Sequence, residues 1–188
     1  MATRISITTR FLLVSLLIAS ATAGQAQCDI FKSEINDLKD YEMAVARYTD
    51  SLRPAAEAAA FAAKFAEGRA HAKQAEYFAG EALAAANEAV SLASDAQYEA
   101  EVCGLKAVVT HAIDAESRAI DARDLMEEAY ANAKKAKTAK NLGDLRYFMR
   151  KSLDASREAS KAAEAATYAA SDSFHSCTHS DAASAGMD

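Results

Sequence analysis

Apolar residues recur three and four positions apart along most of the chain, which is the spacing of one buried face of an α-helix. The most regular pattern spans residues 105–136. Its members are Leu105, Val108, Ala112, Ala115, Ala119, Ala122, Met126, Ala129, Ala133 and Ala136. Similar patterns, also rich in alanine, cover about 28–66, 70–102 and 144–174. In the second of these, Phe78, Ala82 and Ala85 are expected on the buried face. The chain therefore predicts four long helices.

The interruptions between these patterns predict where the helices begin and end. Asp29 is a plausible N-cap for the first helix, and Gly68 suits a left-handed helix end near residues 67–69. A second reversal is expected at Cys103-Gly104, and residues 140–144 contain a turn and a new cap at Asp144. Pro54 lacks a backbone donor, so it should kink the first helix or break it tightly without reversing its direction.

Short connections place successive helices antiparallel, so the predicted fold is all-α, an up-down-up-down four-helix bundle with an alanine-rich seam. The tail, residues 178–188, consists mainly of Ser, Ala, Asp and Gly and is expected to be disordered. The turns after the first and third helices should lie at the same end. A capping cluster of large side chains is expected there, made of Phe61, Phe65, Tyr77, Phe78, Tyr130, Leu145, Tyr147 and Phe148.

The chain also repeats itself at a distance of about 70 residues. Tyr77-Phe78, Leu83, Glu88-Ala89 and Tyr98 return as Tyr147-Phe148, Leu153, Glu158-Ala159 and Tyr168. A fixed period of this length indicates a duplicated unit with room for two helices. We therefore expect two related hairpins, at about 28–102 and 105–177.

Residues 1–27 have the features of a secretory signal peptide. Arg4 and Arg10 are basic, residues 11–19 are apolar, and Ala21-Thr22-Ala23 offers a cleavage site. The apolar run is too short to span a bilayer. The mature chain is therefore expected in the periplasm or outside the cell, without membrane insertion.

Composition and charge narrow the class of partner. The 188 residues include one Pro, no Trp and six Gly, which favours long helices. The net charge is −6, and removal of the two arginines of the leader gives −8. Nucleic acids and anionic membranes require clustered cations, so neither is an expected partner.

Three cysteines, Cys28, Cys103 and Cys177, should meet at one end of an antiparallel bundle. An oxidising compartment favours a disulfide wherever two sulfurs meet. Cys103 with Cys177 is the first choice, and Cys28 is an alternative partner or a free thiol.

The same end carries His175, Cys177 and His179, which could bind a metal ion. Thiolate and imidazole ligands suit zinc or copper. On a regular helix Cys177 points away from the two histidines, so the three converge only if the helix frays. This pattern supports an alternative function in handling copper, zinc or haem.

No constellation typical of an enzyme is present. The chain contains no Glu-x-x-His pair for di-iron, no Cys-x-x-Cys-His, no phosphate-binding glycine loop and no Gly-x-Ser-x-Gly. We therefore expect a non-enzymatic binding or scaffolding module without a cofactor, whose partner is an unidentified protein or a second copy of the chain.

Overall fold

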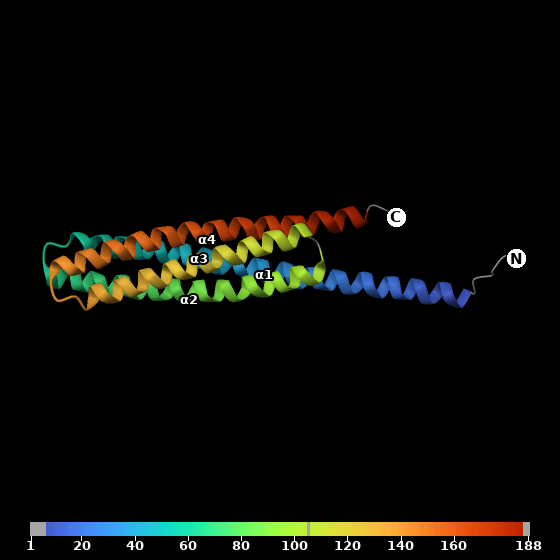
Figure 1. Ribbon diagram of the computed structural model, residues 1–188, viewed down its shortest axis with the longest axis horizontal. Coiled ribbons are helices and arrows are strands. Elements are labelled where there is room, and N and C mark those ends of the chain that lie inside the picture. Colours follow the sequence, from blue (N-terminus) through green and yellow to red (C-terminus); the bar gives the residue numbers. More distant parts are fainter. Residues whose placement is uncertain (1–6, 105, 186–188) are drawn as a thin grey trace.

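In the computed structural model the described residues form four long helices joined by short connections (Figure 1). The structure describes residues 7–104 and 106–185, and the side chains of residues 7–28, Ile30, Cys103 and 178–185 lie outside this description. The helices are α1 (Ile7–Phe61), α2 (Phe65–Cys103), α3 (Lys106–Lys137) and α4 (Leu142–Ala185). Each helix packs against the next, and α1 also packs against α4, whereas α2 and α4 lie diagonally opposite. The predicted all-α, up-down four-helix arrangement is confirmed.

Each helix buries residues at alternating intervals of three and four. Buried positions of α3 are Val108, Ala112, Ala115, Ala119, Ala122, Met126, Ala129, Ala133 and Ala136, as predicted at every described position. In α1 the series is Phe31, Ile35, Leu38, Glu42, Val45, Thr49, Leu52, Ala56 and Ala59. Strict alternation of three and four gives a seven-residue period, which is the packing pattern of left-handed helical bundles.

In α2 the buried face agrees with the predicted series at every described side chain except Phe78. Ala79 and Ala86 occupy the fully buried positions, while Phe78 is half-buried beside them. The spacing alone does not distinguish Phe78 from Ala79, but a bundle with closely packed axes leaves room at this level only for a small side chain.

The first turn lies earlier than predicted. α1 ends at Phe61, residues 62–64 form the connection, and α2 already includes Gly68. A Cβ atom on Gly68 would lie 3.2 Å from Ala62 Cβ and 3.2 Å from Leu145 Cδ2. Gly68 therefore lies at a closely packed position inside the first turns of α2, where an added side chain would require its neighbours to shift, and the prediction that it ends the first helix is wrong.

The other two turns lie close to their predicted places. Gly104 follows α2 in the left-handed conformation, with φ of 70°, and its N–H donates to the carbonyls of Ala100 and Glu101. α4 begins at Leu142, because Asn141 accepts a hydrogen bond of 2.8 Å from the Asp144 N–H. Asn141 is thus the N-cap, and the prediction of Asp144 in that role is wrong.

The outer ends of α1 and α4 also differ from the prediction. α1 begins at Ile7 and runs through Asp29 and Pro54 without a break, so Asp29 is not an N-cap and Pro54 does not split the helix. α4 continues to Ala185 instead of ending near Phe174. The division into a leader, a bundle and a tail stays a prediction. No described helix is both long enough and apolar enough to cross a membrane.

The buried apolar residues fall into two separate clusters. The turn-end cluster comprises the buried apolar residues within 45–60, 72–86, 122–136 and 145–163. The cysteine-end cluster comprises those within 31–38, 89–100, 108–119 and 166–177. Most members of both are alanines, and the large fully buried side chains include Phe31, Ile35, Leu38, Leu52, Met126, Leu145 and Met149.

Candidate functional site

The segments that carry the three cysteines come together at one end of the bundle, as predicted. Phe31, Ala100, Val108 and Cys177 belong to the same cysteine-end cluster. The Ser173 hydroxyl donates a 3.0 Å hydrogen bond to the Val108 carbonyl, which fixes the register of α4 against α3 at this level. The α2–α3 connection lies next to α1 and α4 in Figure 1.

The disulfide itself stays a prediction. Cys177 is fully buried in the cysteine-end cluster. The side chains of Cys28 and Cys103 lie outside the described residues. What the fold provides is the proximity of the segments, because α2 ends at Cys103 beside the level of α4 that contains Cys177.

The two predicted metal ligands whose side chains are described, His175 and Cys177, lie on different faces of one continuous helix. His175 is exposed and its ring meets the half-buried Phe174 ring edge-on at a centroid distance of 6.0 Å, whereas Cys177 faces the core. The side chain of His179 lies outside the described residues. Within the described part of the chain no group of three or more His, Cys, Asp or Glu side chains could hold a metal ion. The metal site at His175, Cys177 and His179 stays a prediction.

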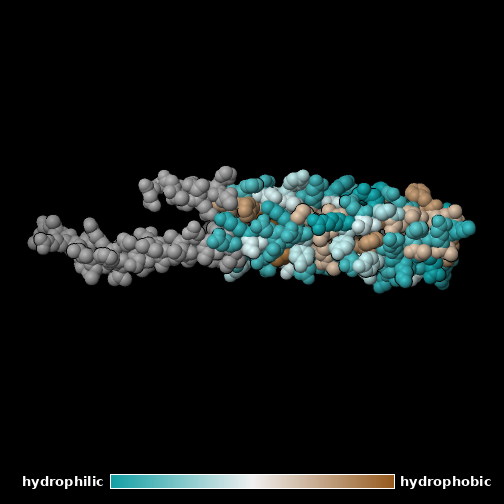
Figure 2. Space-filling view, turned by 180° about the vertical axis from the view of Figure 1, so that it is seen from behind, coloured by the Kyte–Doolittle hydropathy of each residue, from teal (hydrophilic) through white to brown (hydrophobic). Residues whose placement is uncertain are grey.

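Several aromatic side chains lie on the surface instead of in the predicted capping cluster. Phe61 is 72% exposed, and Tyr77 and Tyr147 are 61% and 58% exposed. Leu145 is buried, while Phe65, Phe78, Tyr130 and Phe148 pack against the turn-end cluster. The predicted cap therefore forms only in part. Figure 2 shows a largely hydrophilic surface with small separate hydrophobic areas, one of them at the end that carries the turns.

Two further tyrosines extend this exposed set toward the cysteine end. Tyr98 and Tyr168 are each 64% exposed. Tyr98 follows Tyr77 in α2 by 21 residues, and Tyr168 follows Tyr147 in α4 by the same number. Since 21 residues are three seven-residue periods, the two tyrosines of each helix lie on one face, about 31 Å apart. The sequence repeat signals these positions, but their exposure required the structure.

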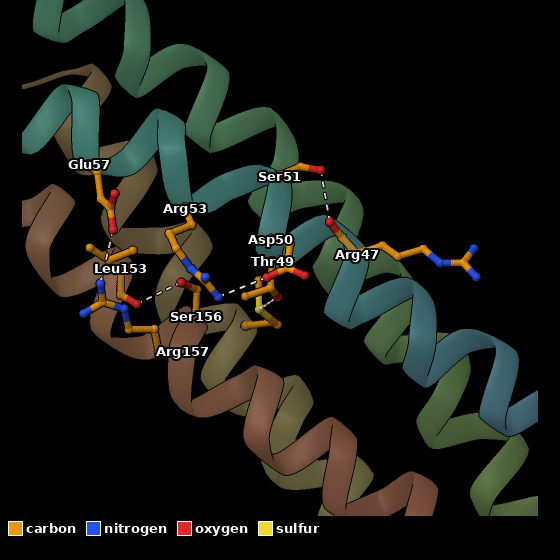
Figure 3. A network of polar contacts seen from close by, with 10 residues as sticks. Arg47, Thr49, Asp50, Ser51, Arg53, Glu57, Leu153, Ser156 and Arg157 are labelled. Carbon is orange, nitrogen blue, oxygen red and sulfur yellow. Dashed lines mark hydrogen bonds and ion pairs between the residues drawn. The ribbon is translucent and has the colours of Figure 1, made fainter.

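A shallow groove between α1, α3 and α4 is lined by charged side chains of both signs. Arg157 of α4 pairs with Glu57 of α1 at 3.3 Å, and Arg53 pairs with Asp50 at 3.0 Å (Figure 3). The buried Thr49 hydroxyl contacts Met126 Sδ at 3.8 Å beneath them. These ion pairs are exposed and contribute little each to stability. None of the polar side chains that line the groove is buried, so the groove is a weak candidate for a ligand site.

Sequence reasoning missed the buried polar residues, and among the described ones Glu42 is the only residue of a charged type. Glu42 of α1 is 1% exposed, and neither carboxyl oxygen has a hydrogen-bond partner. Burial raises its pKa to about 8. The signal was present, because Glu42 lies four residues after Leu38 and three before Val45, and so occupies the core register of α1.

The candidate features are therefore the four most exposed of the described tyrosines, the exposed Phe61 and the buried Glu42. They lie on α1, α2 and α4 and do not form one catalytic constellation. Comparison of the chain with protein-family models, with curated proteins and with solved structures found no match.

Proposed function

We propose that this chain is an exported, non-enzymatic helical bundle that binds a protein partner, or a second copy of itself, through aromatic side chains on its surface. The observation that supports this proposal most directly is the exposure of four tyrosine side chains, each between 58% and 64%: Tyr77, Tyr98, Tyr147 and Tyr168. Tyrosine is enriched in protein interfaces, because its large ring adds contact area while its hydroxyl stays hydrated. The alternative function in metal or haem handling rests on the sequence pattern alone.

The proposal includes a duplicated hairpin with an alanine-rich seam, so that α2 and α4 present the same face twice. Buried positions within 75–100 correspond to buried positions within 145–170 when the numbering is shifted by 70. The Tyr77–Phe78 and Tyr147–Phe148 rings also meet in the same way, with centroids 5.5 and 5.3 Å apart. Because α2 and α4 are diagonal neighbours, the two aromatic faces would point to different sides of the bundle. Such a module could hold two copies of one partner.

Site-specific photo-crosslinking in the cells that make the protein tests this proposal. A benzophenone amino acid replaces Tyr98 in one variant and Tyr168 in another. Matched controls carry it at Thr110 and Ser117 of α3, which are exposed and lie on a helix that carries none of the four tyrosines. We expect adducts of one common mass from positions 98 and 168, and weaker adducts from the controls. Self-association would give an adduct of twice the mass of the chain and would also appear in light scattering.

Two results would count against this function. Equal yields at the tyrosine and control positions would mean that the aromatic faces are not contact surfaces. Protein that purifies with stoichiometric copper, zinc or haem, and loses it in a His175→Ala and His179→Ala variant, would favour the alternative. A cofactor that stays bound in that variant would argue against both.

A further inference from the structure

A carboxyl group sits in the core of the bundle without a hydrogen-bond partner. Glu42 is 1% exposed, and both of its side-chain oxygens are buried and unsatisfied. Burying an unpaired charge is far more costly than burying an unpaired neutral group. The residue can therefore be tolerated in this place only while its carboxyl group carries a proton.

Glu42 also lies where the apolar core is divided. On α1 the cysteine-end cluster reaches Leu38 and the turn-end cluster starts at Val45. On each of the other helices the division falls between two buried alanines that lie three residues apart. These pairs are Ala86 and Ala89 of α2, Ala119 and Ala122 of α3, and Ala163 and Ala166 of α4. Alanine side chains bury little apolar area, so the two clusters are joined weakly at this level.

No cation of the described residues pairs with Glu42, and the arginines that flank the division on α3, Arg118 and Arg123, pair with Asp114 and Asp124 instead. The charged residues between the two clusters are Glu88 on α2, Asp121 on α3 and Glu164 on α4, all exposed. On α1 itself Lys39 and Asp40 lie within one turn, and the Lys39 ammonium is 5.0 Å from the centre of the Phe174 ring. Burial is the only cause of the raised pKa of Glu42.

We propose that Glu42 is a proton-controlled switch that joins the two clusters while it is neutral and releases the cysteine-end part of the bundle when it ionises. The step is the loss of one proton from the Glu42 carboxyl group to solvent, which leaves a carboxylate at the division. That carboxylate regains hydration only if the helices separate there.

The cysteine-end part is the one expected to open. The turn end is tied across the helices, because Arg146 donates to the Ala62 carbonyl, Arg69 donates to the Lys137 carbonyl, and Lys137 pairs with Glu76 at 2.6 Å. At the cysteine end Glu34 has a raised pKa, caused first by burial and then by the acidic neighbours Asp95, Asp37 and Glu99. The ionised Glu34 carboxylate adds repulsion between α1 and α2, because its acidic neighbours Asp95 and Glu99 lie on α2.

The direction of the pH dependence follows from proton linkage. A carboxyl pKa raised from 4.5 to about 8 means that the closed state holds one more proton than the open state between these values. Stability is therefore complete below pH about 4.5 and falls as the pH rises. The opening equilibrium constant should increase about tenfold per pH unit up to pH about 8, and then level off.

Hydrogen exchange of backbone amides between pH 5 and 9, in the presence of reductant, tests the switch. The observed rate of each amide is divided by its intrinsic rate to give the opening constant. In the unmodified chain, amides within 89–100 and 108–119 should show the tenfold dependence of the opening constant. Amides within 72–86 and 122–136 should change less than twofold over the same range. In Glu42→Gln and Glu42→Leu, which cannot ionise at this position, the amides within 89–100 and 108–119 should lose the tenfold dependence.

Matched controls are Glu88→Gln and Glu164→Gln, which remove exposed carboxyl groups at the same level and should leave the dependence unchanged. Glu42→Leu keeps the test decisive if the glutamine variant does not fold, because a leucine suits the apolar core. The proposal is overturned if the leucine variant keeps the tenfold dependence. It is equally overturned if both sets of amides respond alike, since the chain would then unfold as a whole.

Discussion

Two turns lie at the same end of the bundle, and they are stabilised in different ways. The one between α1 and α2 is called the first turn here, and the one between α3 and α4 the second turn. At the second turn Asn141 accepts a hydrogen bond from the Asp144 N–H, and its side-chain amide donates to the Asp144 carboxylate at 2.7 Å. At the first turn Lys64 has the extended backbone of an N-cap but makes no capping bond with its side chain. What closes the first turn is tertiary packing, because Gly68 lets Ala62 and Leu145 approach. One turn is specified locally and the other by a partner helix.

The two turns nevertheless depend on each other through a pair of arginines. Arg146, in the first turns of α4, donates to the Ala62 carbonyl of the first turn. Arg69, in the first turns of α2, donates at 3.2 Å to the Lys137 carbonyl at the end of α3. Each hairpin therefore supplies a donor for a carbonyl that the other hairpin leaves unpaired where its first helix ends.

The largest predicted effect concerns the packing of the first turn. Gly68→Val should reduce the free energy of unfolding by about 2–3 kcal/mol, because the added atoms would overlap Ala62 and the buried Leu145. Urea denaturation followed by circular dichroism measures the change.

Gly80→Ala is the matched control within α2. A Cβ atom there would lie 3.5 Å from the Tyr130 ring, which is an ordinary contact distance. This variant should gain up to about 1 kcal/mol, since alanine favours the helix more than glycine does. A stable Gly68→Val protein would mean that Gly68 is not needed for close packing.

The arginine of α4 should have the next largest effect. Arg146→Met keeps the apolar stem but leaves the Ala62 carbonyl without this donor, and should cost about 1.5–2 kcal/mol. Arg69→Met should cost less, because Arg69 is exposed and water can replace it at the Lys137 carbonyl. Denaturation of both single variants and the double variant checks the order. If the two substitutions reduced the free energy of unfolding equally, the half-buried Arg146 would not contribute more than the exposed Arg69, and this prediction would be wrong.

Sequence reasoning recovered the fold because every helix carries the same period. The series from Val108 to Ala136 is buried at each predicted position, since alternation of three and four fixes one face of a helix. The first turn was misplaced because Ala62-Ala63-Lys64 contains no residue typical of a turn. Its position depends on Leu145, which is far away in the sequence, and no local pattern records that contact.

The candidate site was less accessible to sequence reasoning. The cysteine-bearing segments could be brought together from helix order alone, because antiparallel neighbours return to the same end. The exposure of Tyr77 and Tyr147 could not, since an aromatic residue at helical spacing suits a core equally well. Glu42 was missed because a charged residue in a helix is usually assumed to face solvent, whereas this one is buried.

The cap of the second turn is predicted to contribute less than the packing of the first. Asn141→Ala removes both bonds to Asp144 and should cost about 1 kcal/mol, the usual value for an N-cap. Asn141→Ser, which keeps an acceptor, should recover most of this loss. Thermal unfolding of the three proteins gives the comparison. If the alanine variant matched the unmodified chain, the turn would be set by packing, as the first turn is.

The smallest expected effect comes from adding a side-chain N-cap to the first turn, which the second turn already has. Lys64 has φ of −118° and ψ of 141°, the backbone that an N-cap requires, and Glu67 stands three residues later. Lys64→Ser places an acceptor for the Glu67 N–H and allows the Glu67 carboxylate to return to the N–H of residue 64. The gain should be about 0.5–1 kcal/mol in urea denaturation, and it should shrink in a background that also carries Glu67→Ala. A loss of stability instead would show that the lysine side chain, and not only Gly68, holds the first turn in place.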